Sequence, residues 1–196
     1  MRLNYMNFIR KNDVSRVWGN EMKIEKRIFD ECLIIDPSER KDCRGEMKIF
    51  YSKNEFTQII KNFEIKQMRI YSIQKKNTFF GIHYQSKEKA QGKLINVIQG
   101  KGLDYIVDLR PCSKTFKKYV SFELDARSPK LVYIAPGFGH AFLSTEDNTI
   151  QLFAIDEFFD KEEKGVISYK DPEIGLKLPV EDIIISDYDR EAQKDK

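Results

Sequence analysis

The chain has 196 residues, of which 41% are hydrophobic and 33% are charged. This length suits a single domain with a substantial core, or a domain with an arm. The 34 basic and 31 acidic residues leave a net charge of +3 and are interspersed, which argues against nucleic acid as the partner. No run approaches the ~18 apolar residues that a membrane span needs, so no membrane association is expected.

Cys32, Cys43 and Cys112 are widely spaced and form no C-x-x-C motif. This pattern fits three reduced thiols in a cytoplasmic protein better than a disulfide framework or a zinc site. The first 18 residues also lack the uninterrupted apolar segment of a secretory signal. We therefore expect a cytoplasmic location.

Residues 1–21 show no clean period and are expected to form an N-terminal arm, followed by one domain over residues 22–196. From Met22 onward, short segments rich in Val, Ile, Tyr and Phe alternate with turn residues, which predicts strands. The clearest segments are KIEKRIF (23–29), ECLII (31–35), GEMKIFYS (45–52), IKQMRIYSI (65–73), KLINVIQG (93–100), LDYIVDL (103–109), YVSFELD (119–125), KLVYIA (130–135) and TIQLFAI (149–155).

One helix is predicted near residues 53–63, where Ser52 and Glu55 have the spacing of a capping box. Its apolar stripe consists of Phe56, Ile59, Ile60 and Phe63. Many strands, one good helix and no regular alternation of strand and helix indicate an all-β protein, an antiparallel sandwich or barrel.

The two histidines, His83 and His140, lie in the strand-like segments TFFGIHYQ and APGFGHAF. In a regular strand His83 shares a face with Phe79 and Gly81, while Phe80 points to the other face. Apolar surroundings keep an imidazole neutral and able to accept a proton. Taken alone, a histidine of this kind is more often a satisfied residue of the core or the surface than a catalyst.

Other chemistries find little support in the chain. Two histidines without a His-x-His pair fall short of the three or four ligands of a usual metal site, so no metal is expected. No cysteine neighbours a histidine, and no G-x-S-x-G motif is present. The segment GKGLDYIVD (100–108) lies between two strand segments and predicts a hairpin rather than a phosphate loop.

A series of motifs runs through most of the chain in a fixed order. They are GIHYQ (81–85), QGKL (91–94), DYIVDLR (104–110), SKTF (113–116), PGFGHAF (136–142), DPEIG (171–175) and ISDYD (185–189). Across about residues 25–190 this order resembles the dTDP-4-dehydrorhamnose 3,5-epimerase family. The resemblance implies a cupin-type antiparallel jelly roll with one or few short helices, usually a homodimer, that needs no cofactor or metal.

The same resemblance implies an isomerase that acts on a nucleotide-linked 4-keto-6-deoxyhexose in deoxysugar and surface polysaccharide biosynthesis. Such an enzyme inverts carbons next to the ketone. It needs a base to remove a proton, donors at the developing enolate oxygen, and an acid on the opposite face. By correspondence with the family motifs, His83 is the base, Asp189 the carboxylate that orients it, and Lys93 the cation at the enolate.

Four further residues are expected at the substrate by the same correspondence. His140 and Gln85 belong to the substrate pocket, Arg44 to a contact with the nucleotide phosphates, and Phe153 to the place where the family has its acid tyrosine. Each catalytic or phosphate assignment has a plainer alternative: Lys93 as a solvated hairpin lysine, Asp189 as part of a charged tail, and Arg44 as a surface ion pair.

Three departures from the family pattern bear on the substrate. Phe153 keeps an aromatic ring and loses the proton donor. Phe80 replaces an arginine near the diphosphate, and Met68-Arg69-Ile70 replaces a polar stretch that grips the nucleotide base. Lost polar contacts of this kind cost about 1–3 kcal/mol each, so an altered substrate is expected.

These departures leave three hypotheses. The first is a keto-sugar epimerase with altered specificity, which inverts one carbon, uses another donor such as Tyr84 or a water, or takes another nucleotide. The second is a keto-sugar isomerase that uses the same enolate, and the third a non-catalytic paralogue that binds a nucleotide sugar or a partner enzyme. The joint presence of His83, Lys93, His140 and Asp189 favours catalysis.

The acidic and basic residues of DYIVDLR, which are Asp104, Asp108 and Arg110, are expected to be scaffold.

Overall fold

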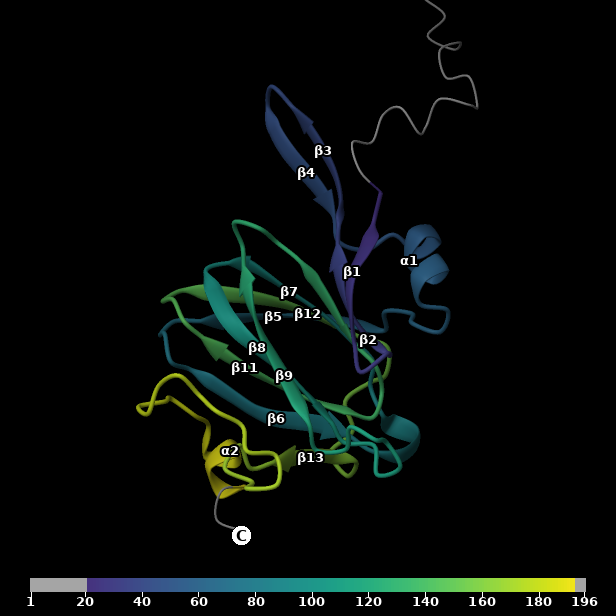
Figure 1. The fold of residues 1–196 in the computed structure, drawn as a ribbon. Helices are drawn as coiled ribbons and strands as arrows, with labels where there is room; N and C mark the ends of the chain where they lie inside the picture. The colour runs from purple at the N-terminus through teal and green to yellow at the C-terminus, as the bar shows by residue number, and fades with distance from the viewer. Residues whose placement is uncertain (1–20, 193–196) are drawn as a thin grey trace, which may run out of the picture.

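Two antiparallel β-sheets face each other in the computed structural model, which describes residues 21–192 (Figure 1). The six-stranded sheet has the order β1 (Lys23–Ile28), β2 (Cys32–Asp36), β10 (Leu131–Ile134), β7 (Lys93–Gln99), β12 (Thr149–Ile155), β5 (Gln67–Ile73). The five-stranded sheet has the order β13 (Lys164–Ile167), β6 (Phe79–Gln85), β11 (Phe138–Ser144), β8 (Lys101–Asp108), β9 (Tyr119–Asp125). The predicted antiparallel all-β architecture is confirmed. The expected arm falls, apart from Glu21, outside the described residues.

A separate hairpin of β3 (Ser38–Asp42) and β4 (Gly45–Ile49) projects from the body of the two sheets (Figure 1). Its two-residue loop, Cys43-Arg44, is closed by the pairing of Asp42 with Gly45. Gly45 has a φ of +136°, a conformation that only glycine adopts readily. The sequence SERKD of β3 has no apolar run, which is why strand propensity alone did not predict this strand.

The predicted helix forms as α1 (Lys53–Ile59) and is shorter than expected. Ser52 occupies the N-cap position, but its side chain makes no capping hydrogen bond, so the predicted capping box was wrong. Burial holds the helix in place instead, since Phe56 is fully buried against Phe63 and Tyr133, the latter on the six-stranded sheet. A short 3-10 turn, Lys87–Lys89, follows β6. A second helix, α2 (Asp187–Glu191), lies near the end of the chain.

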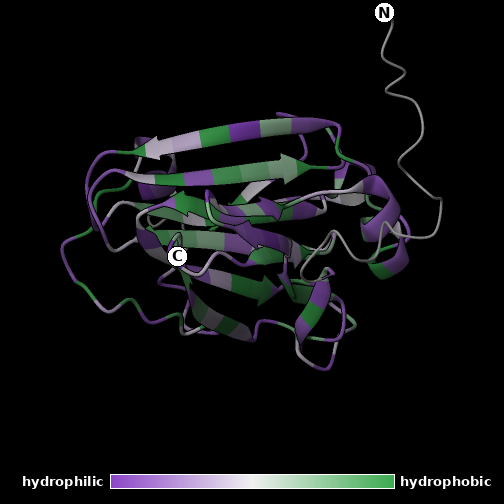
Figure 2. Cartoon of the chain, turned by 90° about the horizontal axis from the view of Figure 1, so that it is seen from above, coloured by the Kyte–Doolittle hydropathy of each residue, from purple (hydrophilic) through white to green (hydrophobic). Residues whose placement is uncertain are grey.

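The main core lies between the two sheets. It combines Ile95 and Ile134 of the six-stranded sheet with Ile106 and Phe142 of the five-stranded sheet. A second cluster covers the other face of the five-stranded sheet, where strand residues such as Phe79 meet the segment that follows β13. Figure 2 shows the resulting bands of hydrophobic and hydrophilic residues along the strands.

The predicted hairpin between β7 and β8 does not form. The two strands belong to different sheets, and the chain passes from one sheet to the other at Gly100. Gly100 has a φ of +74°, and a Cβ there would lie 3.0 Å from the Cα of Thr149. A left-handed, closely packed position of this kind requires glycine, so the GKG sequence serves a crossing between sheets.

Candidate active site

A cavity of about 260 Å³ lies between the sheets, with walls from β5, β7 and β12 on one side and β6 and β11 on the other. Three cationic side chains, Arg69, Lys93 and Lys164, contribute to its lining, and no carboxylate of residues 21–192 does. The chain as a whole is nearly balanced in charge. The cavity therefore has a positive character that suits an anionic ligand.

His83 reaches the cavity because β6 is irregular. From the pair His83 and His140, β6 advances three residues to Phe80 while β11 advances two, which is the geometry of a bulge. The extra residue places both Phe80 and His83 at the cavity, whereas Phe79 and Ile82 join the core on the other face. The strict alternation predicted for this strand, with His83 and Phe79 on one face, was wrong.

Asp189 of α2 holds the His83 ring. One carboxylate oxygen lies 2.5 Å from Nε2 of His83, and the other accepts a hydrogen bond from the backbone N–H of Gly81 at 3.3 Å. Burial raises the pKa of Asp189, but the hydrogen bond and charge of His83, together with the hydrogen bonds to Gly81 and Ser186, outweigh burial and leave this pKa below its ordinary value. An ionised carboxylate accepts the Nε2 proton, so we assign the unprotonated, basic position of the ring to Nδ1.

The local structure explains why this acid comes so close. Ser186 caps α2 by accepting a hydrogen bond from the backbone N–H of Asp189, which fixes the first turn of the helix. A Cβ at Gly81 would lie 3.2 Å from the carboxylate carbon of Asp189. The side chain of Asp189 is 3% exposed, so it is not part of a solvated charged tail.

Lys93 places a buried ammonium opposite the His83 strand. It is 3% exposed, and its Nζ donates a hydrogen bond to the backbone carbonyl of His83 at 2.9 Å. Burial lowers the pKa of Lys93 to about 8, against the opposing effect of the Asp104 charge. Within residues 21–192 no carboxylate forms an ion pair with it, which leaves ammonium N–H donors for a ligand. The alternative of a solvated hairpin lysine does not fit this burial.

His140 forms a second histidine–carboxylate pair. Its Nε2 lies 2.6 Å from Oδ1 of Asp104, a residue of the neighbouring strand β8. Burial lowers the pKa of His140, which keeps the imidazole neutral near pH 7. Its ring centroid lies 6.0 Å from that of Phe153. Asp104, expected to be scaffold, is thus the direct partner of a cavity residue.

Phe153 lies at the cavity within a cluster of aromatic rings. Its centroid is 6.0 Å from that of Tyr71, and the Tyr71 ring lies 5.5 Å from that of Phe80 across the cavity. Phe80 and Phe153 bring no polar atom to this part of the wall. Tyr71 brings a hydroxyl that has no hydrogen-bond partner among the described residues.

Gln85 and Gln151 use their amides differently. Gln85 donates to the carbonyls of Lys89 and Phe158 and accepts from the backbone N–H of Asp160, so its amide mainly holds loops together. Gln151 is 3% exposed, lines the cavity, and has an amide nitrogen with no partner within residues 21–192. A buried donor of this kind gains from a ligand that accepts its hydrogen bond.

Arg44 lies at the tip of the β3–β4 hairpin, away from the cavity lining of its own chain. Its guanidinium is 83% exposed and pairs with Asp42 at 2.6 Å. A contact between Arg44 and a ligand in the cavity of the same chain is therefore not part of this arrangement.

The stretch Met68-Arg69-Ile70 on β5 is less apolar toward the cavity than its sequence suggests. Met68 is 55% exposed and Ile70 is 59% exposed, because both point away from the facing sheet. Arg69 lines the cavity and receives support from the side-chain oxygen of Gln67. Of these three residues only Arg69 therefore lines the cavity, and it brings a charged group there.

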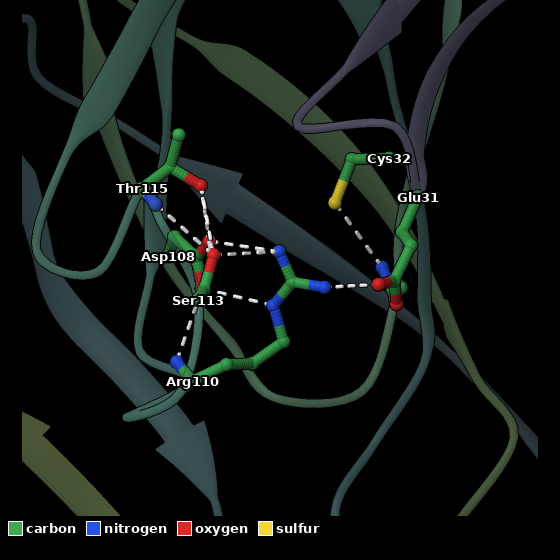
Figure 3. A network of polar contacts seen from close by, with 7 residues as sticks. Glu31, Cys32, Asp108, Arg110, Ser113 and Thr115 are labelled. Atoms are coloured by element: carbon green, nitrogen blue, oxygen red, sulfur yellow. Dashed lines mark hydrogen bonds and ion pairs between the residues drawn. The ribbon is translucent and has the colours of Figure 1, made fainter.

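Asp108 and Arg110 form the network shown in Figure 3. The carboxylate of Asp108 accepts hydrogen bonds from Arg110, Ser113 and Thr115, and Arg110 also pairs with Glu31. Burial opposes ionisation of Asp108, but these donors outweigh it and hold its pKa well below the usual range. The network ties the loop after β8 to the strand it leaves. This network is consistent with the scaffold role predicted for Asp108 and Arg110. Two residues of the SKTF motif, Ser113 and Thr115, belong to it.

Metal and membrane signals are absent from the part of the chain that the structure describes. No group of three or more His, Cys, Asp or Glu side chains within residues 21–192 is placed to hold a metal ion. None of the described helices has the length and apolar character required to span a bilayer.

Comparison with known proteins identifies the family of the chain. A family model described as dTDP-4-dehydrorhamnose 3,5-epimerase matches residues 26–195. The chain belongs to this family. The dTDP-4-dehydrorhamnose 3,5-epimerase of Methanothermobacter thermautotrophicus is 32% identical over 174 residues, which cover 87% of this chain and 92% of the relative. The corresponding enzyme of Shigella flexneri is 30% identical over 174 residues, or 88% of this chain and 96% of the relative.

A crystal structure of the Bacillus anthracis enzyme of the same name, with TDP and PPi bound, matches with a TM-score of 0.84. The sequence identity is 30%, and the match covers 87% of this chain and 97% of that chain. The predicted cupin-type jelly roll and the predicted isomerase of the keto-sugar epimerase class are thereby confirmed.

Several cavity residues carried no sequence signal strong enough to single them out. Tyr71, Gln151 and Lys164 sit in ordinary strand segments, and only the pairing of β5 with β12 and of β13 with β6 brings them to one cavity. Alternation along IKQMRIYSI could have placed Arg69 and Tyr71 on one face. It could not have shown which face met the histidines.

Proposed function

We propose that this protein epimerises a dTDP-linked 4-keto-6-deoxyhexose in deoxysugar biosynthesis, with His83 as the base. The observation that carries the proposal is the pair of His83 and Asp189 at the edge of a positive cavity. The pair presents a basic Nδ1 and keeps the other ring nitrogen occupied. The names of the relatives support the choice of substrate.

The chemistry follows from the arrangement of the three central groups. Nδ1 of His83 removes a proton from the carbon next to the ketone, and Asp189 stabilises the imidazolium that forms. Negative charge develops on the ketone oxygen, where the buried Lys93 ammonium supplies a fixed donor. His140 lies on β11, which pairs with the strand of His83. Its neutral imidazole, held by Asp104, offers a polar group to the sugar.

The diphosphate of the substrate finds its counter-charge on the side chains of Arg69 and Lys164. Arg69 stands on the wall opposite Phe80 and restores part of the positive charge that phenylalanine lacks. Lys164 lies 3.8 Å from the centre of the Tyr188 ring, next to α2. Gln151 supplies the buried amide donor described above.

Deuterium exchange tests this function. The protein is incubated with dTDP-4-keto-6-deoxyglucose in deuterated water, and NMR follows hydrogen loss at the carbons next to the ketone. We expect solvent deuterium at one or both carbons, together with inverted product. A wild-type protein without any exchange on a panel of keto-sugar nucleotides would establish the third hypothesis, a protein that binds without catalysis.

Keto-sugar isomerisation is the second candidate, and the absence of a hydroxyl at Phe153 favours it. A proton removed and returned on one face requires His83 alone. The same NMR experiment separates the two functions, because isomerisation moves the carbonyl and epimerisation leaves it at the same carbon.

A homodimer in the cytoplasm completes the proposal. Ile70 of β5 and Leu152 of β12 are paired neighbours on the outer face of the six-stranded sheet, and Ile70 is 59% exposed. A second copy would cover this apolar surface, and its Arg44 hairpin is the one that could meet the nucleotide of this chain. Sedimentation should show twice the 23.1 kDa chain mass for the wild type and a monomer for Ile70→Lys. A monomeric wild type would rule the dimer out.

A further inference from the structure

Inversion at carbon requires a proton donor on the face opposite the base, and this inference rests on the proposed epimerase function. His83 belongs to β6 in the five-stranded sheet, so the donor must come from the wall formed by the six-stranded sheet. Phe153 occupies that wall with a ring that has no exchangeable proton. The proton donor must therefore be another polar side chain on that wall.

Three tyrosines line the cavity within residues 21–192, and two of them stand on the side of the base. Tyr84 follows His83 on β6 and lies over Gly165, since a Cβ there would approach its hydroxyl to 2.5 Å. Tyr188 precedes Asp189 on α2, and its ring centroid is 6.3 Å from that of His83. A proton from either side chain would return to the face from which it was taken.

Tyr71 is the third, and it comes from β5 in the facing sheet. Its ring lies edge-on to Phe153, with an interplanar angle of 84°, and spans the cavity to Phe80. It is half-buried, and its hydroxyl has no hydrogen-bond partner in the described part of the chain. The hydroxyl is therefore available to a ligand between the walls.

The other polar groups of this wall are less suited to protonate carbon, either because they are not acids near neutral pH or, for Lys93, because of where the ammonium is held. Arg69 does not release a proton near neutral pH, and the amide of Gln151 is not an acid. Lys93 is engaged with the backbone carbonyl of His83, a position that suits the enolate oxygen. We propose that the Tyr71 hydroxyl delivers the proton to the face opposite His83.

The proton balance closes without a co-reactant. Nδ1 of His83 takes the proton from carbon and leaves the enolate. The Tyr71 O–H bond then breaks, its proton bonds to the same carbon on the other face, and a tyrosinate remains. Water returns a proton to Tyr71, and His83 releases its proton to water, so the net change is the inverted carbon alone.

The experiment compares wild type with Tyr71→Phe on dTDP-4-keto-6-deoxyglucose in deuterated water. NMR measures deuterium uptake, and borohydride reduction followed by sugar analysis measures inversion. We expect Tyr71→Phe to lose inversion by ~10²-fold or more while uptake stays within about threefold of wild type, because His83 still exchanges protons on its own face. Tyr71→Phe that inverts at the wild-type rate would overturn the proposal.

Matched variants separate the donor role from a loss of structure. Tyr169→Phe removes the hydroxyl of another half-buried tyrosine, which packs on Phe79 away from the cavity, and should keep both activities. Phe153→Tyr in the Tyr71→Phe background returns a phenol to the same wall and should raise inversion at least tenfold over the single variant. A wild type that takes up deuterium without inverting also overturns the Tyr71 role, whereas a wild type with no uptake overturns the proposed function itself.

Discussion

The cavity holds two histidine–carboxylate pairs with similar short contacts and different surroundings. His83 and Asp189 are 106 residues apart, and the His83 side chain is 39% exposed. His140 and Asp104 are 36 residues apart on neighbouring strands, and the His140 side chain is 8% exposed. The first pair meets the substrate space and solvent, while the second is enclosed by the core between the sheets.

This difference determines what each pair can do with a proton. A base must exchange protons with solvent in every cycle, and the exposed ring of His83 allows that. Burial disfavours the charged imidazolium of His140, so that pair is suited to hold a fixed polar group at the cavity. We therefore expect a similar hydrogen bond to serve proton transfer at His83 and positioning at His140.

The largest expected effect comes from His83→Gln. Removing the base should lower deuterium uptake next to the ketone by ~10³-fold or more, because the other histidine of this wall, His140, is enclosed by the core and held by Asp104. NMR of the dTDP-linked keto-sugar in deuterated water gives the measurement, and circular dichroism verifies the fold. Uptake that survives within tenfold would transfer the role of base to His140.

Asp189→Asn comes next. The amide can no longer stabilise an imidazolium or keep the proton on Nε2, and uptake should fall by ~10²-fold. Asp187→Asn is the matched control on the same helix, since Asp187 is 95% exposed and pairs with Arg190. Equal losses in the two variants would mean that α2, rather than the carboxylate of Asp189, is what the site needs.

Lys93 bonds to the backbone carbonyl of His83, and its lowered pKa predicts that the reaction slows at alkaline pH. Because its pKa is lowered to about 8, uptake should fall roughly tenfold per pH unit above that value as the ammonium is lost. Between about pH 8 and its unfolded value of 10.5 the native state binds fewer protons here than the unfolded chain, so this group adds stability as pH rises. Deprotonation of Lys93 therefore does not unfold the protein in this range, and the expected loss of rate comes from the lost charge.

Lys93→Arg is the control for that profile, because a guanidinium keeps its charge above pH 10. Its alkaline limb should move upward even if its overall rate is lower. An unchanged limb would assign the decline to another group.

Asp104→Asn should have the smallest effect on rate, less than about threefold. Weakening a buried hydrogen bond should instead lower the free energy of unfolding by about 1–3 kcal/mol, which corresponds to a shift of several degrees in melting temperature. Calorimetry and deuterium uptake on one preparation give both values. A loss of uptake as large as that of Asp189→Asn would erase the distinction between the two pairs.

Much of the fold followed from local pattern. Segments such as YVSFELD and IKQMRIYSI alternate apolar and polar residues, and both form the strands expected of them. The residues that correspond to the family motifs at positions 83, 93, 140 and 153 all reach one cavity. Charged or very short strands, such as SERKD and KGVI, had no apolar period and became visible only through their partners.

The site shows where local pattern ends. The all-β class, the family and most of the residues expected at the cavity followed from the sequence alone, because strand propensity and spaced motifs are properties of the chain in one dimension. The folded arrangement was needed to show that a bulge turns His83 inward, that Asp104 bonds His140, that Arg44 stands apart, and that Tyr71 comes from the sheet facing His83. Those facts depend on register and on which sheet each strand joins, and hydrogen bonds between distant strands set both.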